Sequence, residues 1–190
     1  MHSRGLDRTT RGRDTAVLFG DGAGVAILGP TDDLQRGVLT THLYADGRHA
    51  EKLWVDAPGL AHDPFISEEL IRAGKHRAVM DGRDVFKYAS VLMPQSIATA
   101  LKQNGLTPAD VKLLVPHQAN LRIIEMVQKA AGLRDDQVFV NIQKYGNTTA
   151  ASIPIALHEA LDEGRLARGD LLVLTAFGSG FTWASAAVRW

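Results

Sequence analysis

The fold is decided by residues 111–131, which read V-K-L-L-V-P-H-Q-A-N-L-R-I-I-E-M-V-Q-K-A-A. Val111 to Val115 is an apolar run of strand length, and Leu121 to Ala131 has its apolar residues at helical spacing. The motif P-H-Q-A-N lies between them, at the carboxyl end of the strand. Open α/β sheets bind ligands at this end of their strands. We therefore expect His117 to line a pocket. The alternative is that Asn120 only caps the helix and His117 makes a local hydrogen bond.

The chain after this stretch continues to alternate between strand and helix patterns. The expected elements are a strand at Gln137 to Val140, a helix at Ala150 to Leu161, and strands at Leu171 to Ala176 and Phe181 to Val188. This alternation predicts a sheet covered by helices on its faces. The short glycine turn before the last strand predicts an antiparallel pair at the sheet edge.

The chain before this stretch is less regular. Residues 1–14 form a polar arm, and the elements expected after it are strands at 15–19 and 25–28 around a turn at Gly20 to Gly24, a strand at 37–44 and a helix at 83–104. Pro94 either kinks this helix or starts a second one. Residues 48–79 are weakly periodic, and we interpret them as an excursion from the core.

Composition narrows the class of protein. The chain has 190 residues, 45% of them apolar, with 21 Lys plus Arg and 21 Asp plus Glu. Such a chain can bury one core, and its balanced charge gives no reason to expect nucleic acid or an anionic membrane as a partner. It has no apolar run of membrane-spanning length and no signal-peptide pattern, so we expect a cytoplasmic location. It also has no cysteine, which excludes disulfides and thiolate metal sites.

Two further motifs lie at expected strand ends. Tyr145 to Ser152 reads Y-G-N-T-T-A-A-S, and Ala176 to Phe181 reads A-F-G-S-G-F. Taken singly, each is compatible with ordinary turn chemistry. Together with His117 they would place an imidazole, an amide and free backbone N–H groups at one cleft, which suits stabilisation of an oxyanion or enolate. The sequence contains no nucleophile elbow, H-E-x-x-H helix or Walker loop, and no metal site is expected.

Four separated motifs resemble one enzyme family. F-G-D-G-A-G from Phe19, P-H-Q-A-N from Pro116, Y-G-N-T-T-A-A-S from Tyr145 and A-F-G-S-G-F-T-W from Ala176 are similar in order and spacing to β-ketoacyl-acyl-carrier-protein synthase III. M-D-G-R-D-V-F-K from Met80 extends the resemblance. It implies the C-terminal half of a thiolase-like α-β-α-β-α fold over residues 15–190, with a mixed five-stranded sheet covered by helices. Residues 100–190 correspond to the segment that carries the His and Asn.

The resemblance implies roles in a decarboxylative condensation. His117 and Asn147 match the side-chain donors that hold the malonyl thioester oxygen as an enolate forms. Phe177 matches the aromatic residue beside the malonyl carboxylate, and the backbone N–H of Ser179 matches a donor of a second oxyanion hole. Serine stands there in place of the family's glycine, so the role requires a backbone without positive φ.

The resemblance also implies contacts with substrate carriers. The positions that match the pantetheine tunnel are Met80, Gly82, Phe86, Ala119 and Asn120. Lys87, Arg122 and Lys129 match a basic patch that meets the acidic acyl-carrier protein. No permanently bound cofactor is implied, since coenzyme A thioesters and phosphopantetheine act as substrate carriers.

The family's cysteine nucleophile has no counterpart in this sequence. The resemblance therefore implies that the N-terminal half of the enzyme, acyl-CoA and a homodimer partner are needed, and that this chain alone does not condense substrates. The leading interpretation is acyl-CoA condensation, with acetyl-CoA as the expected primer, at the start of fatty-acid synthesis. The alternatives are a thiolase-fold acyltransferase, a synthase that primes a secondary-metabolite pathway, and a non-catalytic remnant.

Overall fold

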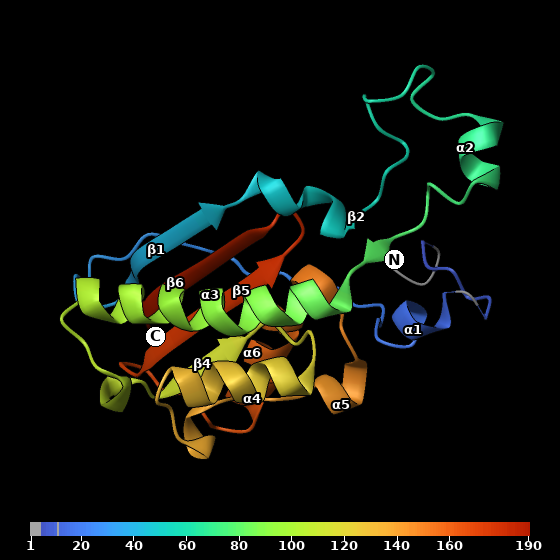
Figure 1. The fold of residues 1–190 in the computed structure, drawn as a ribbon. Coiled ribbons are helices and arrows are strands. Elements are labelled where there is room, and N and C mark those ends of the chain that lie inside the picture. Colours follow the sequence, from blue (N-terminus) through green and yellow to red (C-terminus); the bar gives the residue numbers. More distant parts are fainter. Residues whose placement is uncertain (1–4, 11) are drawn as a thin grey trace.

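The computed structural model describes residues 5–10 and 12–190, and a four-stranded sheet forms its centre (Figure 1). The strands are β1 (Gly37–Ala45), β4 (Leu113–Pro116), β5 (Leu171–Gly178) and β6 (Thr182–Arg189). Their order is β1-β6-β5-β4, with β4 and β5 parallel and the other neighbours antiparallel. The expected mixed α/β sheet is present, but it has four strands rather than five. The predicted polar arm includes positions 1–4 and 11, which lie outside the described residues.

Helices cover both faces of the sheet, as the alternating pattern predicted. Leu114, Val173 and Ala187 belong to the cluster that packs with α3 (Gly82–Gln103) and α4 (Leu121–Ala130). Leu113, Val115 and Leu172 belong to the opposite cluster, with α6 (Ser152–Asp162). Neighbouring residues of a strand point to opposite faces, so β4, β5 and β6 each contribute to both clusters. Figure 1 shows α3 and α4 on one side of the strands and α6 on the other.

Helix α3 runs without interruption through Pro94. The Asp81 carboxylate accepts a hydrogen bond from the backbone N–H of Asp84 at 3.1 Å and caps the start of the helix. Pro94 is buried inside the helix. The helix ends before Gly105, whose φ of +65° suits glycine after a helix end. Of the two possibilities at Pro94, the one with a second helix is therefore wrong.

The excursion stays outside the core. It contains η2 (Gly47–Lys52), β2 (Leu53–Trp54), α2 (Glu68–Arg72) and β3 (Val79–Met80). β2 and β3 pair with each other, with Leu53 opposite Met80. Of residues 48–79, all of which are described, Ala57 is the one that is buried. None of the helices in residues 5–10 and 12–190 combines the length and the apolar character that a membrane span requires.

The predicted strand at Gln137 to Val140 is wrong. Only Val138 makes an isolated bridge, with Leu114. The flanking residues form η4 (Asp135–Gln137) and the short α5 (Ile142–Tyr145), so too little chain is left for a ladder. This removes the fifth strand from the sheet.

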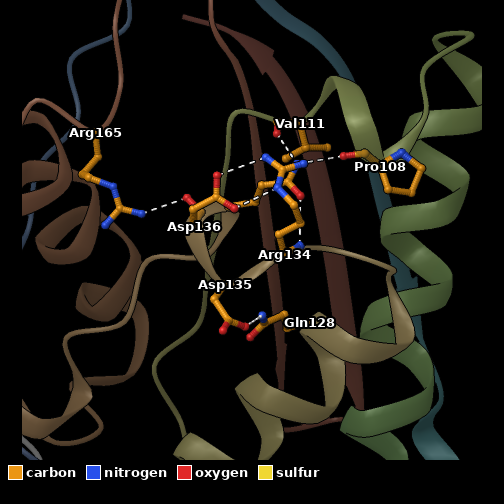
Figure 2. A network of polar contacts seen from close by, with 8 residues as sticks. Pro108, Val111, Gln128, Arg134, Asp135, Asp136 and Arg165 are labelled. Atoms are coloured by element: carbon orange, nitrogen blue, oxygen red, sulfur yellow. Dashed lines mark hydrogen bonds and ion pairs between the residues drawn. The ribbon is translucent and has the colours of Figure 1, made fainter.

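The side chain of Gln137 explains the turn before this bridge, and its partners Pro108, Val111 and Arg134 are labelled in Figure 2. Its amide donates to the carbonyls of Pro108 and Val111, and its Oε1 accepts from the N–H of Arg134 at 2.9 Å. Pro108 belongs to η3 (Pro108–Asp110). Arg134 also pairs with Asp136. These contacts fix the end of the sheet at which β4 begins.

The predicted strands at 15–19 and 25–28 are also wrong. Residues 13–16 form α1 (Arg13–Ala16), and Phe19 makes only an isolated parallel bridge with Asn147. Val25, Ile27 and Leu28 are 88%, 93% and 85% exposed. Within the described chain, the strand-like pattern of these residues has no sheet to join.

The glycines of G-D-G-A-G allow this segment to approach α5 and α6. A Cβ on Gly20 would lie 2.0 Å from the Tyr145 carbonyl oxygen, and one on Gly24 would lie 2.4 Å from the Pro154 ring. A side chain at either position would collide with its neighbour. The glycines of this motif therefore allow close packing against neighbouring residues. The tight turn that the sequence predicted at Gly20 to Gly24 is absent.

The last two strands form the predicted antiparallel pair, but β6 is not an edge strand. β1 pairs along the other side of β6, with Tyr44 opposite Trp183, and the two rings stack at 5.4 Å. The edges of the sheet are therefore β1 and β4.

Candidate functional site

The site begins where β4 ends. The backbone N–H of His117 donates to the Thr175 carbonyl at 2.8 Å, which continues the parallel pairing of β4 and β5 by one residue. Asn120 caps α4 by accepting from the Arg122 N–H at 2.9 Å. The capping role expected for Asn120 is thus confirmed. The imidazole of His117, in contrast, makes a long-range contact.

The His117 imidazole lies against the first residue of α6. Its Nδ1 is 2.6 Å from Ser152 Oγ, and Ser152 is 2% exposed. Burial lowers the pKa of His117 from 6.5 to about 4, because the charged form loses its hydration there. His117 is therefore neutral at physiological pH. A neutral imidazole has one N–H donor and one acceptor nitrogen.

Gln118 anchors the backbone beside His117. Its side chain is 1% exposed and donates to the Pro116 carbonyl at 2.8 Å and to the Phe139 carbonyl at 3.2 Å. Its Oε1 accepts from the Asn141 N–H at 3.0 Å. These contacts connect the end of β4 to the segment before α5, so the loop that carries His117 is held on both sides.

Asn147 lies at the same end of the sheet. Its backbone bonds on both sides with the 18–20 segment, through the Leu18 carbonyl at 2.8 Å and the Gly20 N–H at 2.9 Å. Its Oδ1 accepts from the Thr149 N–H at 2.8 Å. Thr149, in η5 (Thr149–Ala151), has a φ of +49°, which is unusual for a β-branched residue. This strained backbone points the Thr149 N–H toward the amide of Asn147.

The end of β5 adds aromatic side chains and a backbone turn. Phe177 is buried, and its ring centroid lies 4.8 Å from that of Phe181. Ser179 Oγ donates to the Leu53 carbonyl. Among the described non-glycine residues only Thr149 has a positive φ. Ser179 therefore has no positive φ, which is the backbone condition that the family resemblance sets for a serine at this position.

The arrangement can donate hydrogen bonds, and the sequence supplies no cysteine to it. With Nδ1 against Ser152, His117 presents Nε2, and with Oδ1 engaged, Asn147 presents its NH2 group. Neither Nε2 nor Nδ2 has an acceptor within the described part of the chain. Preorganised neutral donors of this kind stabilise developing negative charge on a carbonyl oxygen.

Most of the other expected site residues belong to segments near the starts of α3 and α4, whereas Lys129 lies in the last turn of α4. Met80 is in β3, Gly82 and the exposed Phe86 are in the first turns of α3, and Ala119 and Asn120 precede α4. Lys87, Arg122 and Lys129 are all exposed, and Lys87 lies over the Tyr88 ring at 5.5 Å. Figure 1 shows the start of α3 at the same end as α5. The roles of these residues stay predictions.

Sequence reasoning missed two residues. Ser152 and Thr149 belong to the motif Y-G-N-T-T-A-A-S, which by itself predicts only a turn that leads into a helix. The spacing of the motif puts Ser152 at the first turn of a helix, which was a usable signal. Its contact with His117, 35 positions away, becomes visible only in three dimensions.

Comparisons with known proteins give a consistent result. The family model described as 3-Oxoacyl-[acyl-carrier-protein (ACP)] synthase III C terminal matches residues 101–190, and the model described as 3-Oxoacyl-[acyl-carrier-protein (ACP)] synthase III matches residues 1–47. The beta-ketoacyl-[acyl-carrier-protein] synthase III of Roseiflexus sp. (strain RS-1) is 47% identical over 94% of this chain and 53% of its own length. That of Rhodospirillum centenum is 46% identical over 99% of this chain and 55% of its own length.

A solved structure agrees with these matches. The 3-oxoacyl-[acyl-carrier-protein] synthase III of Aquifex aeolicus VF5 superposes with a TM-score of 0.86 at 41% identity, over 99% of this chain and 55% of that chain. The chain thus spans about half the length of the relatives it matches. The similarity also extends through residues 1–14, ahead of the Thr15 limit that the motifs suggested.

The buried imidazole predicts a pH dependence of stability. Unfolding frees His117 to bind a proton near pH 6.5, whereas the folded state binds it only near pH 4. The unfolded state therefore holds more protons between these values, and stability falls as the pH decreases through this window. Between pH 7 and pH 5 this group should remove about 2 kcal/mol of unfolding free energy.

Urea unfolding at pH 7 and pH 5 measures this effect. In His117→Gln the fall in unfolding free energy between pH 7 and pH 5 should be smaller by the contribution of His117. The control His42→Gln, which removes an imidazole from β1, should show the same fall as the wild type. Equal acid losses in the wild type and His117→Gln would contradict the assigned burial.

Proposed function

The chain belongs to the β-ketoacyl-acyl-carrier-protein synthase III family as its C-terminal part, and we propose that it supplies the enolate-stabilising half of a decarboxylative condensation. The observation that carries this proposal is the pair of neutral donors formed by His117 and Asn147. The chain contains no cysteine, so the acyl group is held by the N-terminal half of the enzyme. The substrates we propose are an acyl-CoA, with acetyl-CoA as primer, and malonyl-acyl-carrier protein, in the cytoplasm.

In the proposed reaction, both hydrogen-bond donors act on the thioester oxygen of the malonyl group. The bond between the malonyl carboxylate and its CH2 group breaks, CO2 leaves, and the electron pair forms an enolate on the thioester oxygen. His117 Nε2–H and the Asn147 amide donate to that oxygen. The enolate carbon then attacks the acyl thioester, and the cysteine thiolate of the other half leaves. His117 is suited to this role because it stays neutral and needs no proton exchange with solvent.

Two further groups support the reaction. Phe177 provides an apolar wall, packed against Phe181, beside the carboxylate that departs. The N–H of Ser179 would donate to the oxyanion of the second step. Asn147 and Phe177 together favour decarboxylation over simple acyl transfer, in which a malonyl carboxylate plays no part.

The exposed apolar segment supports a missing partner half. Val25, Ile27 and Leu28 have strand-like sequence but lie exposed along the surface. Contiguous exposed apolar side chains typically mark an interface. We propose that the N-terminal half covers them and that the whole enzyme is a homodimer.

The catalytic proposal is tested in a completed enzyme, meaning this chain joined to a family N-terminal half. His117→Ala or Asn147→Ala should lower malonyl decarboxylation by about a hundredfold to a thousandfold, because one oxyanion donor is lost. Transfer of the acyl group from CoA to the cysteine should continue. His42→Ala is the matched control and should keep both activities. Loss of self-acylation with decarboxylation retained would reverse the assignment.

The carrier-docking proposal rests on exposed basic side chains. Arg122 and Lys129 are seven residues apart on one face of α4, and neither has an ion pair among the described residues. Exposed charge pairs contribute only about 0–1 kcal/mol each, so docking depends on their sum and on steering. An acidic carrier protein and a phosphopantetheine arm that passes Met80, Gly82, Phe86, Ala119 and Asn120 fit this edge.

Arg122→Glu tests the docking surface in the completed enzyme. The KM for malonyl-acyl-carrier protein should rise strongly, because the reversed charge repels the acidic carrier, while acylation by acetyl-CoA should change little. Added salt should have the same effect on the unmutated enzyme. Lys112→Glu makes the same charge change at the opposite end of β4 and is the control. An equal loss for both substrates would show that Arg122 shapes the tunnel or the fold instead.

A further inference from the structure

The buried side chain of Ser152 contacts a loop that is distant from it in the sequence. Ser152 is the first residue of α6, it is 2% exposed, and its Oγ contacts two atoms that belong to the loop after β4. One is Nδ1 of His117 at 2.6 Å and the other is the backbone nitrogen of Gln118 at 3.2 Å. The hydroxyl therefore joins α6 to the loop that carries the imidazole.

The direction of these hydrogen bonds follows from what each group can do. The Gln118 N–H can only donate, so Ser152 Oγ accepts from it. If Nδ1 of His117 also donated, the hydroxyl hydrogen would need a third partner, and the described residues provide none. An unpaired buried hydroxyl costs about 1–3 kcal/mol. The arrangement that satisfies every group has Gln118 donating to Ser152 and Ser152 donating to Nδ1.

This direction determines the tautomer of His117. An Nδ1 that accepts a hydrogen bond carries no proton, so the single proton of the neutral ring is on Nε2. Nε2 is then a donor, which is the form that an enolate oxygen requires. With the opposite tautomer, Nε2 would present a lone pair to the oxyanion and repel it.

The donor chain is held rigid at both ends. The Gln118 N–H is fixed by the buried side-chain contacts of the same residue with Pro116, Phe139 and Asn141. Ser152 is fixed because Ala156 and Ala160 of α6 are fully buried against the sheet. The Thr149 N–H orients Asn147 from the same short segment. Thr149 of η5 thus orients Asn147, and Ser152 at the start of α6 orients His117.

We propose that Ser152 is a positioning residue that fixes the Nε2–H tautomer of His117 through the chain Gln118 N–H, Ser152 O–H, His117 Nδ1. The tautomer itself is a property of this chain, whereas its importance for the reaction rests on the proposed function. A residue that acts in this way touches no substrate. Removal of such hydrogen-bond partners behind functional histidines typically lowers activity by about tenfold to a hundredfold.

The first test leaves Ser152 in place. Nitrogen-15 NMR of the 190-residue chain, labelled on histidine and assigned through His117→Asn, distinguishes a protonated from an unprotonated ring nitrogen. We expect Nε2 protonated and Nδ1 unprotonated at pH 7. A protonated Nδ1 would overturn the proposal, whatever the activity of the enzyme.

The second test removes the hydroxyl. In Ser152→Ala the two nitrogen shifts should move toward each other, because the ring can then take both tautomers. In the completed enzyme kcat for malonyl decarboxylation should fall by about tenfold to a hundredfold, with little change in KM and with self-acylation retained. Ser152→Thr keeps a hydroxyl and should restore much of the loss.

A matched control and a second readout separate the possible failures. Ser185→Ala removes another buried hydroxyl, which donates to the Ser96 carbonyl, and should leave the shifts and kcat unchanged. Unchanged shifts and unchanged decarboxylation in Ser152→Ala would overturn the positioning role. Full decarboxylation in His117→Ala would instead refute the proposed function and leave the tautomer assignment standing.

Discussion

The hydrogen bond between His117 and Ser152 links the two parts of the fold that must meet for the site to exist. His117 follows β4, whose residues are buried on both faces, and Ser152 begins α6, which covers one of those faces. Burial at this junction lowers the pKa of His117 and so favours the neutral imidazole. Packing of the sheet therefore determines the chemistry of the site. The helix on one face and the strand pairing of β4 with β5 set where the ring nitrogen points.

Local sequence signals predicted the elements that carry the site. The apolar run before His117, the helical spacing after Asn120 and the small residues after Asn147 each report on structure within a few positions. The A-F-G-S-G-F motif lies at the end of β5, as the alternation of strand and helix predicted, whereas the strand expected before Y-G-N-T-T-A-A-S is absent. The role of Ser152 escaped prediction because it depends on a contact between segments 35 positions apart.

The wrong strand predictions have different physical causes. Residues 137–140 have strand-like composition, but the buried amide of Gln137 binds the carbonyls of Pro108 and Val111 and turns the chain away. Residues 15–28 have a strand pattern without a sheet to join within the described chain. Gly20 lets this segment lie against α5 and Gly24 lets it lie against α6, while Val25 and Ile27 stay exposed. A strand pattern that finds no partner in its own chain supports an interface with the missing half.

We propose that this chain supplies the hydrogen-bond donors of the site, whereas the cysteine nucleophile lies on another polypeptide segment. Mixing the purified chain with a separately purified N-terminal half that bears the cysteine tests this claim most directly. The account predicts that the two halves sediment together and that only the mixture converts acyl-CoA and malonyl-acyl-carrier protein into the condensed product. Condensation by the 190-residue chain alone, or a stable complex that acylates its cysteine but never condenses, would contradict it.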